Sequence, residues 1–104
     1  MSEQFVVSSV QHRAFGKLIQ VIFSEKFLLR LTLAEASSLS FALVAVRNGI
    51  SPEHEIFMSP IASDMAFIGA VGKDGIRIAQ PEGELDFTWT DVEALAASLA
   101  AAIG

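Results

Sequence analysis

The sequence of 104 residues contains no cysteine and few charged residues. Without a thiol the chain can form neither a disulfide bond nor a thiolate zinc site. Aspartate, glutamate, lysine and arginine make up 18% of the residues, compared with about 25% in typical globular domains. The apolar fraction is high, at 52%. Because a small domain has a large surface to cover, we expect part of its apolar surface to be buried against a second copy.

Targeting and membrane-spanning segments are also missing. Met1 is followed by Ser2-Glu3-Gln4, without a basic segment that leads into an apolar core, so we expect no secretory signal peptide. The longest apolar stretch, residues 39–46, is interrupted by Ser40 and falls well short of the ~18 residues of a membrane-spanning helix. We therefore expect a cytoplasmic protein without a membrane partner. Its length predicts one domain, residues 1–104.

The most informative pattern in the chain occurs twice. Residues 31–36 read Leu-Thr-Leu-Ala-Glu-Ala, and residues 89–94 read Trp-Thr-Asp-Val-Glu-Ala. Each copy follows a β-like segment and opens an apolar helical run. The Thr-x-x-Glu spacing is typical of a capping box, in which the hydroxyl and the carboxylate each bond a backbone N–H group at a helix start. The predicted helix caps are Thr32, Glu35, Thr90 and Glu93.

Strand-like segments surround the two helices. Runs rich in β-branched and aromatic residues, bounded by glycine and proline turns, predict about six or seven strands. The expected strands are 4–10, 17–23, 27–31, 55–61, 65–71, 76–79 and 85–89. Asn48-Gly49 ends the first helix, and the second runs to near Ile103. We predict an α+β fold in which one antiparallel sheet carries both helices on one face, with an internal β-β-α pseudo-repeat of about 4–49 and 55–104.

Both predicted helices are poor in charge. No charged residue occurs between Glu35 and Arg47 in the first helix, and none follows Glu93 in the second. A helix that is apolar on opposite sides is normally buried on both. We therefore expect the helices to pack against each other, or against those of a second copy, with a dimer as the leading assembly. The predicted interface residues are Phe41, Val44, Ala45, Ala97 and Ala101.

The net charge of −5 is unevenly distributed. Residues 1–52 carry five basic and three acidic side chains, a net charge of +2, whereas residues 53–104 carry two basic and nine acidic ones, a net charge of −7. Halves of opposite sign favour contacts between copies. The basic side chains on or beside the first predicted hairpin are Arg13, Lys17, Lys26 and Arg30. Basic strands with aromatic residues can hold single-stranded nucleic acid, although the net negative charge argues against this.

The sequence offers no catalytic constellation. His12 and His54 have no partner at i+3 or i+4 for a helical metal site. Residues 69–73, Gly-Ala-Val-Gly-Lys, resemble a fragment of a phosphate loop, but Asp74 stands where a serine or threonine would hold magnesium. We therefore predict no catalytic, cofactor-binding or metal-binding residue, and expect a non-enzymatic, self-associating domain with an accessory or regulatory role.

Two other functions stay open on the sequence. The first is single-stranded nucleic-acid binding through the first hairpin. The second is small-ligand binding, or a small enzyme, with a pocket between sheet and helices.

The element order resembles that of the Whirly family, single-stranded-DNA-binding proteins whose repeated β-sheet units each end in a helix. The resemblance spans residues 4–103 and rests on this order together with Leu31-Thr32 and Trp89-Thr90 at the strand-to-helix junctions. It implies the family's fold and a single-stranded DNA partner. The Lys-Gly-Lys-Ala-Ala-Leu signature of that family is absent, and Gly16-Lys17-Leu18-Ile19 does not replace it. No binding residue can therefore be carried over to this chain.

Overall fold

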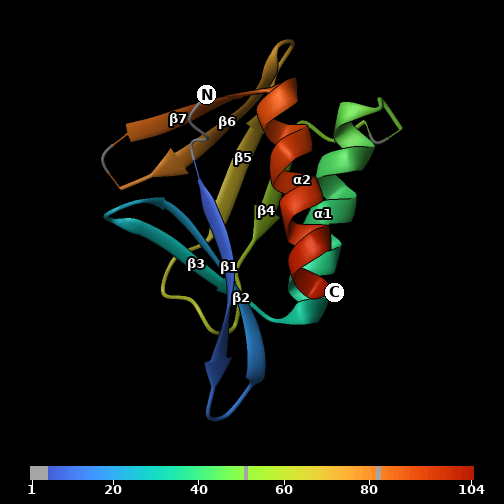
Figure 1. Ribbon diagram of the computed structural model, residues 1–104. Helices are drawn as coiled ribbons and strands as arrows, with labels where there is room; N and C mark the ends of the chain where they lie inside the picture. The colour runs from blue at the N-terminus through green and yellow to red at the C-terminus, as the bar shows by residue number, and fades with distance from the viewer. Residues whose placement is uncertain (1–4, 51, 82) are drawn as a thin grey trace.

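The chain folds into two antiparallel sheets and a pair of helices (Figure 1). The structure is a computed structural model that describes residues 5–50, 52–81 and 83–104. The strands are β1 (Val6–His12), β2 (Gly16–Ser24), β3 (Phe27–Leu31), β4 (Glu55–Met58), β5 (Phe67–Val71), β6 (Gly75–Gln80) and β7 (Gly83–Thr88). The helices are α1 (Leu33–Arg47) and α2 (Trp89–Ile103). The predicted α+β class is confirmed.

The seven strands form two sheets, whereas we expected one. Sheet A contains β1, β2 and β3, and sheet B contains β4, β5, β6 and β7, each in sequence order. Neighbouring strands within each sheet are antiparallel and are joined by turns or loops, so local connections set the order. Helix α1 separates β3 from β4. The alternation of apolar and polar residues within a strand does not show whether the strands before and after this helix are hydrogen-bonded to each other in one sheet.

The pseudo-repeat stays a prediction. Each sheet is followed by one helix, but the first unit has three strands and the second has four. The expected first unit begins at residue 4, which lies outside the described residues.

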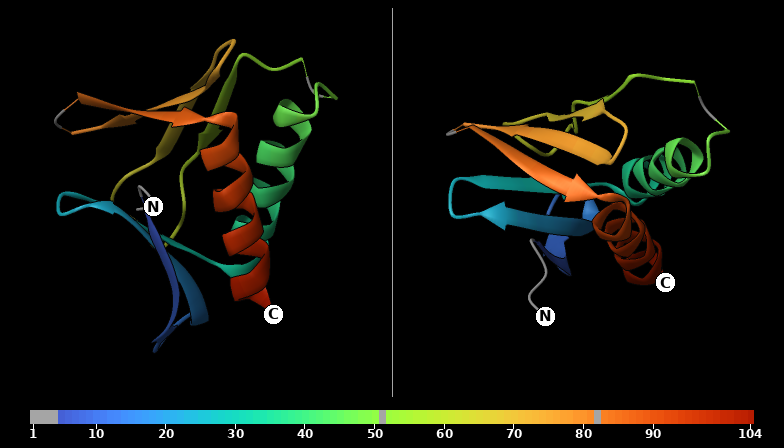
Figure 2. Two further views of the ribbon diagram at one scale, coloured as in Figure 1. Left: turned by 45° about the horizontal axis from the view of Figure 1, so that its top comes forward. Right: turned by 90° about the horizontal axis from the view of Figure 1, so that it is seen from above.

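One apolar core joins the two sheets and the helices. Figure 2 shows the sheets on one side of the molecule and the helices side by side on the other. Phe23 of sheet A lies between Phe67 and Phe87 of sheet B, with ring centroids 6.3 and 6.0 Å apart. The helices bury one stripe each: Ala36, Leu39, Leu43 and Val46 in α1, and Val92, Leu95, Ala96 and Leu99 in α2. Three layers of apolar side chains therefore meet in one core.

The predicted cap of α1 is confirmed. The Thr32 hydroxyl accepts a hydrogen bond from the Glu35 backbone N–H at 3.1 Å, and the Glu35 carboxylate accepts one from the Thr32 N–H at 2.9 Å. The other Glu35 oxygen accepts from the Ile61 N–H at 3.0 Å. One carboxylate therefore caps the helix and also ties the β4–β5 connection to it.

The predicted cap of α2 is wrong by two residues. The N-cap is Thr88, whose hydroxyl accepts from the Asp91 N–H at 3.2 Å, while the Asp91 carboxylate accepts from the Thr88 N–H at 3.0 Å. Thr90 and Glu93 lie inside the helix and are exposed. Thr88-x-x-Asp91 has the spacing of a capping box as well. Because β7 ends at Thr88, the helix begins after Thr88, and this box forms the cap in place of Thr90 and Glu93.

Thr88→Ala is expected to lower the free energy of unfolding by about 1 kcal/mol, because the Asp91 N–H loses its acceptor at the helix start. Thr90→Ala is the matched control: its side chain is exposed within the helix, so the change should stay within ~0.5 kcal/mol. Urea unfolding of both variants followed by circular dichroism measures the difference. Equal losses in the two variants would contradict this assignment.

Candidate functional site

Helices α1 and α2 pack side by side and run antiparallel (Figures 1 and 2). The Ser40 hydroxyl donates a hydrogen bond to the Ala96 carbonyl oxygen at 3.0 Å. Nearer the start of α2, the Arg47 guanidinium pairs with the Glu93 carboxylate. The predicted packing of the two helices against each other is confirmed. Glu93 is an ion-pair partner on the surface, where such pairs contribute ~1 kcal/mol at most.

Part of the exposed side of this helix pair is apolar. We call it the helical face, and it consists of Phe41, Val44, Ala97, Ala100 and Ala101. Phe41 is 76% exposed, so its ring projects into solvent. The three alanines of α2 have short side chains and leave the surface close to the helix backbone. Ala100 belongs to this face but was not predicted, although its spacing from Ala97 by three residues places it on the same side of the helix.

Ala45 does not belong to the helical face, which corrects the prediction. It is only 8% exposed. After α1 ends, the chain turns back, and the Ile50 N–H donates a hydrogen bond to the Ala45 carbonyl oxygen at 2.9 Å. A helical period identifies the side of α1 on which Ala45 lies, but it cannot show that the following connection covers that side.

The four predicted basic residues form two separate pairs. Arg13 and Lys17 lie at the turn between β1 and β2, whereas Lys26 and Arg30 line a surface hollow of about 200 Å³ beside the β2–β3 turn. β2 is nine residues long, so at ~3.3 Å per residue its ends lie about 25 Å apart. Arg30 pairs with Gln20 across the sheet, and alternation places Gln20 and Lys17 on opposite faces. The structure therefore does not gather these cations into one patch.

The edge of β3 near Arg30 is closed by a side chain. The Ser63 hydroxyl accepts a hydrogen bond from the Arg30 backbone N–H at 2.7 Å and donates one to the Arg30 carbonyl oxygen at 2.8 Å. It occupies both backbone positions that another strand would bond. Since free strand edges invite pairing with other chains, this part of sheet A is protected from edge-to-edge association.

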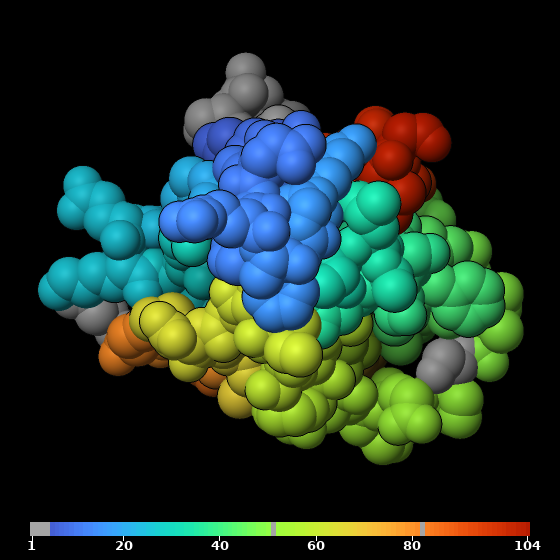
Figure 3. All heavy atoms as spheres, turned by 90° about the horizontal axis from the view of Figure 1, so that it is seen from below, coloured from blue at the N-terminus to red at the C-terminus, as the bar shows by residue number. Residues whose placement is uncertain are grey.

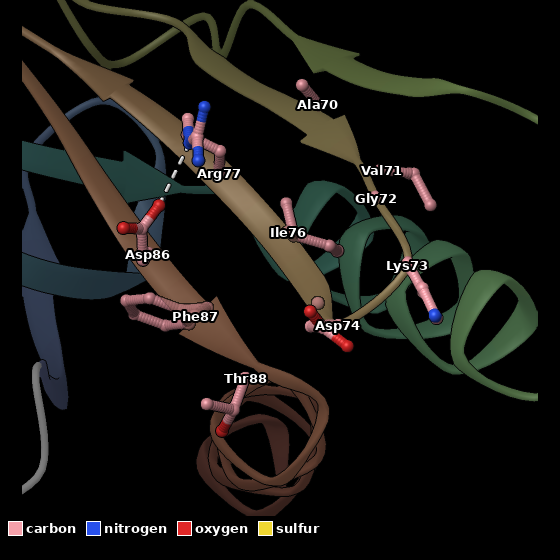
Figure 4. A pocket seen from close by; sticks show the side chains of 11 residues that line it. Ala70, Val71, Gly72, Lys73, Asp74, Ile76, Arg77, Asp86, Phe87 and Thr88 are labelled. Atoms are coloured by element: carbon pink, nitrogen blue, oxygen red, sulfur yellow. Dashed lines mark hydrogen bonds and ion pairs between the residues drawn. The ribbon is translucent and has the colours of Figure 1, made fainter.

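A larger hollow, of about 470 Å³, lies on the outer face of sheet B (Figure 4). It is lined by residues 70–77 and 86–88, and we call it the sheet B hollow. Its lining includes three small residues: Ala70, Gly72 and Gly75. The Trp89 indole N–H donates to the Lys73 carbonyl oxygen at 3.0 Å, which fastens the β5–β6 turn to the start of α2.

Arg77 stands on this outer face beside two carboxylates. Its Nε donates a hydrogen bond to Asp86 at 2.9 Å and lies 3.7 Å from the Glu84 carboxylate. The hydrogen bond to Asp86, with the negative charges of Asp86 and Glu84, raises the pKa of Arg77 above its usual value. Arg77 was not singled out from the sequence. The register that places it opposite Asp86 across the β6–β7 hairpin depends on the turn at Pro81.

The histidine and acidic side chains of the described residues do not gather into a metal site. Within residues 5–50, 52–81 and 83–104, no group of three or more histidine, aspartate and glutamate side chains is placed to hold a metal ion. His12 has a structural role instead, because its Nδ1 accepts hydrogen bonds from the backbone N–H groups of Ala14 and Phe15. Neither α1 nor α2 is long and apolar enough to cross a membrane.

No protein-family model, no curated protein and no solved structure matches this chain. The resemblance to the Whirly family stays a prediction from element order, and no activity or partner is transferred from a relative.

Proposed function

We propose that this protein is a non-enzymatic, self-associating domain whose helical face forms a homodimer interface, and that it has an accessory or regulatory role in the cytoplasm. One observation carries the proposal. The helical face consists of apolar side chains that a single copy leaves exposed, and the largest of them, Phe41, is 76% exposed. Exposed apolar patches on small domains mark interaction sites.

The shape of the helical face suits a second copy of itself. Phe41 and Val44 project from α1, while Ala97, Ala100 and Ala101 leave α2 low. In a two-fold arrangement, the projecting residues of each copy lie on the alanines of the other, so one contact is made twice. Alanine faces permit close approach of helix backbones, and the charged side chains that border the face, Arg47 and Glu93, are already paired with each other.

The size of the helical face predicts weak affinity. Full burial of a phenylalanine or valine side chain contributes ~1.5–3 kcal/mol, and a two-fold dimer buries Phe41 and Val44 twice. Their combined gain is comparable to the ~8 kcal/mol of a micromolar complex, but association itself costs several kcal/mol. After that cost a net gain of about 4 kcal/mol remains, so we expect dissociation near the millimolar range, with the concentration of the protein controlling the state of assembly.

The two alternative functions have less support. Nucleic-acid binding through the first hairpin calls for a continuous basic surface, and the four cations form two separate pairs, one at the β1–β2 turn and one in the hollow beside β3. A ligand site between sheets and helices calls for an internal cavity, whereas that space holds the apolar core and both hollows described above lie on outer surfaces.

Sedimentation velocity of the whole chain from micromolar to millimolar concentrations tests the proposal. At high salt we expect a monomer–dimer equilibrium that shifts with concentration, because salt screens charged contacts but does not prevent the burial of apolar side chains. Hydrogen exchange should show slower exchange of α1 and α2 amides as the concentration rises. A monomer at every concentration would refute the proposed function.

A further inference from the structure

The hairpin of β1 and β2 extends beyond the third strand of sheet A. The last pair that joins β2 to β3 at this end is Ile19 with Leu31. β1 and β2 continue as a two-stranded ribbon through three further pairs: Val10 with Leu18, Gln11 with Lys17, and His12 with Gly16. This ribbon reaches the lower end of the molecule in Figure 1, and Figure 3 views it from below, in blue. We call residues 12–17 the hairpin tip.

Contacts within the tip hold it in one shape. His12 Nδ1 accepts hydrogen bonds from the N–H groups of Ala14 at 3.0 Å and Phe15 at 3.2 Å, and the His12 and Phe15 rings lie 4.9 Å apart. Gly16 adopts a φ of 76°, which ends the turn. Phe15 remains 42% exposed. An exposed aromatic ring on a turn that is already ordered loses little entropy on binding.

The tip is basic, and so is the hairpin that carries it. Residues 5–24 include Arg13 and Lys17 but contain no aspartate or glutamate. This segment therefore presents two cations on either side of Phe15 without an acidic residue of its own. A partner surface for the tip should offer an apolar hollow with an excess of carboxylates.

The outer face of sheet B offers a hollow, exposed apolar side chains beside it and an excess of carboxylates. Glu55, Ala70, Arg77 and Asp86 are successive cross-strand partners in one row across its four strands, so their side chains share one face. Beside this row, Phe57 is 62% exposed and pairs with Ile68. The charged residues on or beside the sheet B hollow are four carboxylates and two cations: Glu55, Asp74, Glu84, Asp86, Lys73 and Arg77. A hollow of about 470 Å³ lies within the ~300–1,000 Å³ range of pockets that take organic groups.

We infer that the hairpin tip of one copy docks into the sheet B hollow of another copy, with Phe15 in the hollow and Arg13 and Lys17 beside its carboxylates. The tip and the β5–β6 turn lie at opposite ends of the molecule in Figure 1, whose longest extent is 40 Å. One copy therefore cannot fill its own hollow. A contact between different surfaces leaves a free tip and a free hollow at the two ends, so copies add in rows or close into rings.

This contact is independent of the helical face, and charge reversal tests it on the whole chain. We compare a tip variant, Arg13→Glu with Lys17→Glu, a hollow variant, Glu55→Lys with Asp86→Lys, and a chain that carries all four changes. Sedimentation velocity at low salt should show wild-type species larger than a dimer, which shrink as salt is added. Each double variant should lose these species, with roughly tenfold weaker association, and the fourfold variant should regain them because its acidic tip faces a basic hollow.

Lys26→Glu with Arg30→Glu is the matched control, since it makes the same change in net charge as the tip variant but in the separate hollow that Lys26 and Arg30 line. It should assemble as the wild type does. Phe15→Ser, which alters no charge, should reduce the amount of the species larger than a dimer.

The inference is overturned if the wild type never exceeds a dimer at low salt, if the tip variant assembles normally, or if the fourfold variant fails to recover these species. Repeating the series in a Phe41→Asp background separates this outcome from failure of the helical-face dimer.

Discussion

Gly75→Ala is expected to destabilise the fold on the order of 3 kcal/mol, one of the two largest effects foreseen for this chain. Gly75 begins β6 with a φ of 156°. A Cβ atom placed there would lie 1.8 Å from the Phe87 carbonyl oxygen on β7. Neither backbone can shift without breaking the pairing of Gly75 with Thr88, the residue that also caps α2. The clash therefore reaches both sheet B and the start of the last helix.

Gly72→Ala provides the control within the same turn. The nearest atom to a Cβ at Gly72 is the Gly75 carbonyl oxygen at 3.7 Å, an ordinary van der Waals distance. Its free energy of unfolding should change by less than ~0.5 kcal/mol. Chemical unfolding of the two variants side by side decides the matter. Equal free energies of unfolding for the two variants would contradict the close approach of Gly75 to the Phe87 carbonyl oxygen.

Phe41→Asp is expected to weaken self-association by about 100-fold or more, because removing a central apolar anchor costs ~2 kcal/mol or more per copy. The new carboxylate would also face the alanines of the partner without a cation to pair with. Monomer stability should change little, since Phe41 is 76% exposed within one copy. Sedimentation equilibrium gives the dissociation constant, and thermal unfolding at low concentration reports on the monomer.

Ile61→Asp is a suitable comparison for Phe41→Asp. Ile61 is 70% exposed in the β4–β5 connection, so this change also replaces a solvent-facing apolar side chain with a carboxylate, but away from the helical face. Its dissociation constant should match that of the wild type. Loss of association in both variants would indicate a general effect of added charge and would argue against the helical face as the interface.

Local features of the sequence predicted the secondary structure well. Thr32 and Glu35 mark the start of α1 because both halves of a capping box lie within four residues of chain. The β6–β7 hairpin follows from an alternating strand on each side of a proline–glycine turn. The second cap was misplaced because two overlapping boxes compete at residues 88–93, and the end of β7, which decides between them, depends on its pairing with β6.

The candidate surfaces depended less on local features. Phe41 and Ala97 could be assigned to an exposed apolar face because the helical period shows which residues lie opposite the core stripe. Ala45 could not be excluded, since the connection that covers it follows the helix. Arg13 and Arg30 could not be separated from each other by their positions in the sequence, because the distance between them is set by the length and register of β2.

The sequence by itself determined the α+β class, the nine elements to within a few residues, the apolar character of both helices and the opposite charges of the two halves. These properties depend on neighbouring residues, whose spacing is set by helix and strand periods. Only the tertiary structure decided that the strands divide into two sheets, that Thr88 caps α2, that Ala45 is covered, and that a hollow lies beside Arg77 and Asp86. These depend on which distant segments meet, and contacts between distant segments are selected by the packing of the whole core.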